Sequence, residues 1–255
     1  MAKRKSTATR RAESEAARSR AAAIRAEQER KERRRRTAVV SAVVVVVLAL
    51  VLGIGYAVQS RRDTSTAAGT PPTGAVGYAV PAGPDSAPVK VAVYEDFLCP
   101  FCGQFEAASR DALEKQVEAG KVQLQYHVLS FLDGSTSTEY SSRAANALAV
   151  VLDTSGPEVA KKFHDLLFEN QPAEGSAGLS DAKLVSLAVQ AGAEASAVQK
   201  GIDDRTFAQW VKNVNDQASK DGVNSTPTVK IDGTVVKFTT TDELVSKVEK
   251  AVAAG

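Results

Sequence analysis

Cys99 and Cys102 are the two cysteines of this 255-residue chain. The residues between them, Pro100 and Phe101, give a spacing at which the sulfurs can bond to each other without a shift of the backbone. The pattern predicts reversible thiol–disulfide exchange. A framework of structural disulfides would need more cysteines at wider spacing, so the pair does not act as a scaffold.

Two other kinds of site contain the same cysteine spacing. A zinc site would need two further ligands, and the available histidines, His127 and His164, lie about 37 residues apart in different predicted elements. A permanent disulfide would add little stability because the loop it closes is so short. We therefore expect no metal and no cofactor.

The elements around the pair explain how it would be positioned. Residues 89–94 alternate between valine and other residues, which predicts a half-buried strand. A helical pattern then follows up to Gly120, and a second alternating run over residues 122–128 predicts another strand. Strand, helix and strand in about 40 residues form a βαβ unit, in which the two strands are normally parallel.

At the start of such a helix the two cysteines would have different roles. Cys99 would cap the helix, and Pro100 would occupy the first helical position, where a missing N–H costs nothing. The unpaired amides and the helix dipole favour a thiolate at Cys99 and lower its pKa from about 8.5. We therefore expect Cys99 to be the nucleophile and Cys102, on the inner side of the helix, to be the resolving thiol.

The remaining residues up to the C-terminus are predicted to form a block of helices, two strands and a final helix. Residues 138–220 have almost wholly helical patterns, and one run places Phe207, Trp210, Val211 and Val214 on a single face. Strands are predicted at 226–231 and 234–238, joined by a turn at 232–233. A final helix from residue 241 would turn Leu244, Val248 and Val252 inward. The body thus reads β-α-β, a helical block, then β-β-α.

Two motifs carry a resemblance to a known family. They are Tyr-Glu-Asp-Phe-Leu-Cys-Pro-Phe-Cys at 94–102 and Val-Asn-Ser-Thr-Pro-Thr at 223–228, with the helical block between them. Over residues 86–254 the chain resembles the DsbA-like branch of the thioredoxin superfamily. The resemblance implies an α/β thioredoxin-like fold with a helical insertion at about 136–221, and a protein disulfide oxidoreductase activity that uses Cys99 and Cys102.

The resemblance also implies where substrate would bind. Pro227 would be cis and pack against the Cys pair, leaving the backbone of Thr226 to pair with an extended substrate segment. Pro100 and an exposed Phe101 would complete this surface. DsbA-type enzymes often carry histidine where this chain has Phe101, so a strongly oxidising potential is not implied by the motif.

Other polar residues near the pair carry weaker expectations. Glu95 or Asp96 would raise the thiol pKa or handle its proton if either approached the sulfur. A solvated turn is the more usual outcome for both. His127 is expected on a polar or helix-covered sheet face, and His164 on the exposed side of its helix.

The N-terminal third is organised differently. Residues 1–36 hold fourteen Lys or Arg and five Asp or Glu, a net charge of +9, so the remainder carries −7. Residues 37–58 contain a run of 21 uncharged residues, long enough to cross a hydrocarbon core of about 30 Å. The basic residues before it predict a cytoplasmic N-terminus, and a retained anchor is favoured over a cleaved signal peptide. Residues 59–85, rich in Pro, Gly and Thr, are interpreted as a linker to a domain at 86–255.

The sequence therefore predicts a bacterial single-pass membrane protein with its catalytic domain outside the cytoplasm. Its partners would be exported protein substrates and a membrane redox partner that reoxidises it. The basic segment is attributed to attraction to lipid headgroups and not to nucleic acid. Two alternatives stay open: a reductase or isomerase of the same fold, for example in cytochrome maturation, and a non-catalytic module that binds clients or copper.

Overall fold

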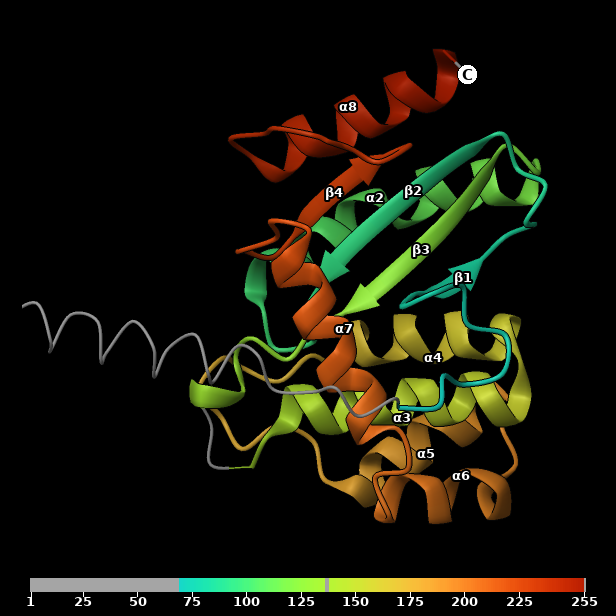
Figure 1. The fold of residues 1–255 in the computed structure, drawn as a ribbon, viewed down its shortest axis with the longest axis vertical. Coiled ribbons are helices and arrows are strands. Elements are labelled where there is room, and N and C mark those ends of the chain that lie inside the picture. Colours follow the sequence, from blue (N-terminus) through green and yellow to red (C-terminus); the bar gives the residue numbers. More distant parts are fainter. Residues whose placement is uncertain (1–68, 136–137, 255) are drawn as a thin grey trace, which may run out of the picture. The chain divides into compact units, whose positions relative to one another are not determined.

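A five-stranded mixed sheet lies at the centre of the structure (Figure 1). The computed structural model describes residues 69–135 and 138–254, all within one compact unit that spans residues 64–255. The sheet order is β1-β3-β2-β4-β5. The strands are β1 (Val80–Ala82), β2 (Val89–Glu95), β3 (Val122–Val128), β4 (Thr228–Ile231) and β5 (Thr234–Val235).

The βαβ unit predicted around the cysteines is present. β2 and β3 pair in parallel, with Val89 opposite Val122 and Glu95 opposite Val128, and α2 (Pro100–Glu118) connects them. β4 pairs with β2 in the antiparallel sense, and β5 continues the sheet from β4. The predicted strand 234–238 is shorter than expected, because pairing ends at Val235.

One boundary of the predicted domain needs correction. Val80–Ala82, assigned above to the linker, forms β1 and pairs with β3. Ala79 beside it is fully buried. The folded domain therefore begins before residue 86.

The helical insertion follows β3 and ends before β4. After a short 3₁₀ turn (Asp133–Ser135) come α3 (Tyr140–Ser155), α4 (Pro157–Glu169), α5 (Asp181–Ala191), α6 (Ala195–Asp203) and α7 (Ala208–Lys220). The first four of these helices pack on one another, while α4 also contacts β1, and α7 returns to contact β3 (Figure 1). The insertion thus packs directly against the sheet.

The terminal helix closes the fold on the other side of the cysteine helix. α8 (Thr241–Ala254) packs along α2 and buries Leu244, Val248 and Val252, as the sequence predicted. The predicted apolar face of α7 is also buried.

The predicted basic segment 1–36 and membrane helix 37–58 lie outside the described residues. Within residues 69–135 and 138–254, every helix is too short or too polar to cross a membrane.

Candidate functional site

The cysteine pair occupies the first turn of α2. Cys99 is the N-cap, its carbonyl oxygen accepts hydrogen bonds from the amides of Cys102 (3.0 Å) and Gly103 (3.2 Å), and Pro100 is the first helical residue. Both cysteines are free thiols. Cys99 is 5% exposed and Cys102 is fully buried. This is the placement that the sequence predicted for an attacking and a resolving thiol.

The pKa values of the two thiols are shifted in opposite directions. A hydrogen bond from the Cys102 thiol does most to lower the pKa of Cys99 to about 6, against the opposing effect of burial, and Thr226 and the amides of Cys102 and Phe101 add to it. Burial, together with the neighbouring Cys99 and the charge of Glu95, raises the pKa of Cys102 well above its usual value. At neutral pH Cys99 is therefore largely a thiolate, whereas Cys102 keeps its proton.

The segment before β4 lies against Cys99. The Thr226–Pro227 peptide bond is cis, and the Thr226 carbonyl oxygen is 3.5 Å from the Cys99 sulfur. Beside this contact is a groove of about 450 Å³. It is lined by uncharged residues, namely Phe101, Gln104, Ser225, Thr226, Pro227, Phe238, Thr239 and Thr240. Phe101 is 63% exposed, as expected, and its ring forms part of the groove.

Asp96 lies in no solvated turn, contrary to the more usual outcome expected above. It is fully buried, and its carboxylate accepts hydrogen bonds from the Leu98 amide (2.9 Å), the Ser141 hydroxyl (2.6 Å) and the Leu132 amide (3.0 Å). Its carbonyl oxygen accepts a further bond from the Cys99 amide (2.9 Å). Burial raises the pKa of Asp96 despite these bonds. Asp96 therefore joins the segment before Cys99 to the loop after β3 and to α3.

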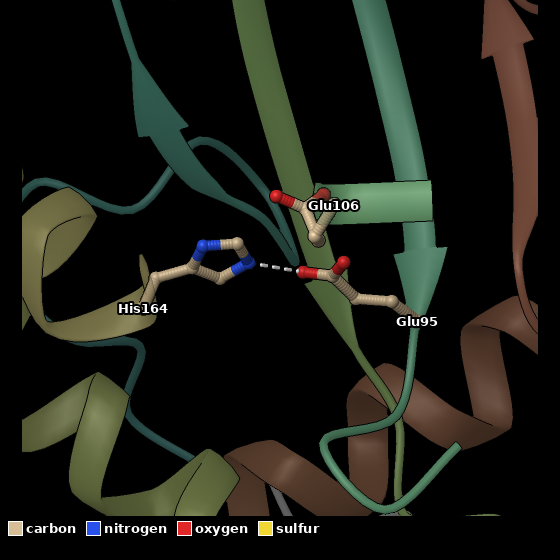
Figure 2. A group of neighbouring side chains, drawn as sticks. All are labelled: Glu95, Glu106 and His164. Atoms are coloured by element: carbon tan, nitrogen blue, oxygen red, sulfur yellow. Dashed lines mark hydrogen bonds and ion pairs between the residues drawn. The ribbon is translucent and has the colours of Figure 1, made fainter. Parts of the chain in front are cut away.

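Glu95 is buried as well, and it meets a histidine that was expected to be exposed. His164 on α4 is 0% exposed, so that expectation was wrong, and its Nε2 lies 2.5 Å from Glu95 Oε1. Glu106 on α2 points toward the same place (Figure 2). Glu95 lies at the end of β2, so the cluster combines one residue from each of three elements.

The charges of this cluster are balanced by protons. Burial, reinforced by the charge of Glu95, raises the pKa of Glu106 to about 8. Burial alone would lower the pKa of His164, but Glu95 and Asp165 raise it to about 9. At neutral pH His164 is thus an imidazolium and Glu106 a neutral carboxylic acid.

This cluster is also the group of described residues whose donor atoms are close enough to suggest a metal site. Atoms from all three side chains lie within 4.8 Å of one another. However, the Glu95 and His164 donor atoms are hydrogen-bonded directly to each other.

Two contacts were beyond the sequence arguments above. Gln171, just after α4, donates from Nε2 to the carbonyl oxygens of Phe97 (3.1 Å) and Cys99 (2.9 Å), which fixes the backbone at the pair. Glu106 was missed too, although it lies four residues after Cys102 and so on the same helix face. His127 stacks on Tyr94 with ring centroids 4.3 Å apart and lies outside the cluster.

Comparison with known proteins agrees with this geometry. A family model described as thioredoxin (Thioredoxin_4) matches residues 76–250. The reduced disulfide bond oxidoreductase DsbG of Mycobacterium tuberculosis is 33% identical, with a TM-score of 0.60 over 71% of this chain and 90% of that one. Reduced DsbA from the same organism is 32% identical, with a TM-score of 0.59 over 70% of this chain and 94% of that one.

One relative with a similar sequence is a much longer protein. The serine/threonine-protein kinase PknE of Mycobacterium tuberculosis is 31% identical over 163 residues, which cover 61% of this chain but 29% of the kinase. The chain thus spans less than a third of that relative's length.

With the matched fold, the free thiol pair and the cis-proline beside it, the chain belongs to the thioredoxin family as a DsbA-like thiol–disulfide oxidoreductase.

Proposed function

We propose that this oxidoreductase forms disulfides in exported proteins, with Cys99 as the attacked sulfur and Cys102 as its resolving partner. In that direction a substrate thiolate attacks the Cys99 sulfur of the oxidised pair. The Cys99–Cys102 bond breaks, a Cys99–substrate disulfide forms, and Cys102 leaves with the electron pair and takes a proton. A second substrate thiolate then attacks the substrate sulfur of the mixed disulfide and releases reduced enzyme.

The observation that carries this direction is the stabilised thiolate of Cys99. Its pKa of about 6 means that the reduced enzyme gains free energy at neutral pH from ionisation, which favours giving the disulfide away. One pH unit above that pKa, the gain is about 1.4 kcal/mol, equivalent to about 30 mV for a two-electron couple.

The uncharged groove beside Cys99 supports a substrate in extended form. Thr226 would offer its backbone to the substrate, while Pro227, Pro100 and Phe101 would contact side chains next to the substrate cysteine. Glu95 would handle the proton of Cys102, because its charge acts on that thiol. Asp96, with three donors on its carboxylate, suits a positioning role better than proton transfer.

The proposal places the domain outside the cytoplasm. Residues 37–58 would form a single membrane-spanning anchor, residues 1–36 would stay in the cytoplasm, and the linker after residue 58 would lead to the domain. A membrane redox partner would then reoxidise the pair. The support for this arrangement is the charge and hydropathy pattern of the sequence.

Trapping of substrates in cells tests the proposal. In a full-length Cys102→Ser variant, the Cys99 thiolate can still attack a disulfide of an exported protein, whose second sulfur leaves as a thiol. No resolving thiol then releases Cys99, so mixed disulfides with exported proteins should accumulate. A Cys99→Ser variant is the matched control and should trap none. The proposal would be contradicted if Cys102→Ser formed no mixed disulfides, or if it trapped only cytoplasmic proteins.

A further inference from the structure

Gln171 contacts the start of the cysteine helix from the helical insertion. It lies just after the C-cap of α4, and its Nε2 donates to the carbonyl oxygens of Phe97 (3.1 Å) and Cys99 (2.9 Å). One side-chain amide thus joins the segment that enters α2 to the residue that caps it. The amides of Cys102 and Gly103 bond to the same Cys99 oxygen, so this oxygen has donors from the helix and from the insertion.

The Cys99 carbonyl marks the bond about which the sulfur can turn relative to the helix. Its direction is set by the ψ angle of Cys99, which is 115°. The next backbone dihedral, φ of Pro100, is fixed by the proline ring. A rotation at Cys99 would therefore carry the first turn of α2 away from the sulfur, including the amides of Phe101 and Cys102 that bond to it. A hydrogen bond that fixes this carbonyl also fixes those amides relative to the sulfur.

Gly103 leaves the space that the Gln171 amide occupies. It lies in the interior of α2, where glycine is less favourable than alanine because its backbone loses more freedom on folding. A Cβ at this position would lie 2.2 Å from Gln171 Oε1, 3.0 Å from its Cδ and 3.4 Å from its Nε2, and these are the three atoms nearest to it. Alanine at position 103 would therefore push the Gln171 amide away from the two carbonyl oxygens.

We propose that Gln171 is a positioning residue for Cys99: its amide holds the start of α2 so that two helix amides face the Cys99 sulfur, and Gly103 makes room for this contact. The insertion thereby helps to set the reactivity of the pair without supplying a reacting atom. This role of Gln171 rests on the proposed role of Cys99 as the attacked sulfur.

The pH dependence of alkylation tests the role of Gln171. Reduced full-length protein is treated with iodoacetamide from pH 4 to pH 9, and the Cys99 adduct is quantified by mass spectrometry. The thiolate is the species that reacts, and Cys102 is fully buried with a raised pKa, so the midpoint of the rate reports the pKa of Cys99.

Two variants reach the contact from its two sides. Gln171→Ala removes the donor, and Gly103→Ala displaces it. Gln199→Ala is the matched control, because the Gln199 amide also donates a hydrogen bond (2.9 Å, to Asp203) but is exposed on α6.

We expect the midpoint to rise from about 6 by about one unit in Gln171→Ala and in Gly103→Ala, because the amides that stabilise the thiolate lose their alignment. Alkylation at pH 5 should then be about tenfold slower than in wild type. At pH 9 the thiol is ionised in every variant, so the rates should agree. Gln199→Ala should match wild type at both pH values. Gly103→Ala should add no further shift to Gln171→Ala, because the amide that it displaces is already absent.

The possible outcomes separate the role of Gln171 from the proposed function. A wild-type midpoint near 6 that neither variant changes would overturn the role of Gln171, whatever the variants do to stability. A rate lowered equally at pH 5 and pH 9 would also overturn it, because that result indicates blocked access to the sulfur. Gly103→Ala decides the matter if Gln171→Ala does not fold. A wild-type midpoint near the ordinary thiol value of about 8.5 would contradict the proposed function as well.

Discussion

The Cys102 thiol is the main cause of the low pKa of Cys99. The effect of removing the Cys102 thiol on that pKa can therefore be predicted quantitatively. Cys102→Ala deletes the donor, whereas Cys102→Ser keeps a hydroxyl donor at the same position. A hydrogen bond to a charged group contributes about 1.5–3 kcal/mol. Since one pKa unit corresponds to 1.36 kcal/mol, Cys102→Ala should raise the pKa of Cys99 by roughly 1–2 units.

Alkylation by iodoacetamide measures this shift, because either variant leaves Cys99 as the one cysteine in the chain. Only the thiolate reacts, so the rate follows ionisation. In Cys102→Ser the rate should have its midpoint near the wild-type value of about 6. In Cys102→Ala the midpoint should lie roughly 1–2 units higher, and alkylation at pH 6 should be roughly tenfold slower. Equal midpoints in the two variants would refute the assigned cause.

Four further predictions rest on the same geometry. The reduction potential should fall by about 59 mV per pH unit below pH 6 and by about 30 mV per pH unit above it. The slope changes because reduction takes up two protons below the pKa of Cys99 and one proton above it. An unbroken slope to pH 8 would contradict that pKa. Histidine NMR titrations should place His127 near 4, where burial and Lys230 lower its pKa, and His164 near 9. The His164 pKa is raised on folding, so the stabilisation that its charge gives the folded state is fully present below pH 6.5. In the oxidised protein the free energy of unfolding should therefore drop by roughly 3 kcal/mol as pH rises through 9. Urea unfolding that shows no drop would argue against a charged His164. Asp96→Ala should cost roughly 2–4 kcal/mol of unfolding free energy, because it removes the acceptor of two buried hydrogen bonds and one part-buried hydrogen bond. Asp96→Asn should be less harmful, and equal stability to wild type would mean that these bonds contribute little.

Much of the fold was predictable because local patterns carry it. The alternation at 89–94 and 122–128, the helix opened by Pro100 and the inward residues of α8 all agree with the structure. β1 was harder to predict, since three residues between turns give almost no periodicity.

The cysteine pair was predictable for a similar reason: its spacing and its place between strand and helix are properties of adjacent residues. The burial of Glu95 and His164 is not. These residues are 69 positions apart, and they meet because the insertion packs α4 against the sheet. Periodicity along α4 cannot show that a polar residue faces a buried carboxylate. That Glu106 shares a helix face with Cys102 can be predicted from their spacing. That it joins Glu95 and His164 depends on the same packing of α4 against the sheet.

The most direct test of the account is to follow the two electrons. Oxidised full-length protein is mixed with an equimolar amount of a reduced, unfolded protein that carries one cysteine pair, and both are weighed by mass spectrometry after acid quench. We predict that the enzyme gains two hydrogens at Cys99 and Cys102 while the substrate loses two, and that Cys99→Ser transfers none. An enzyme that stayed oxidised beside a reduced substrate, or a Cys99→Ser variant as active as wild type, would contradict the central claim.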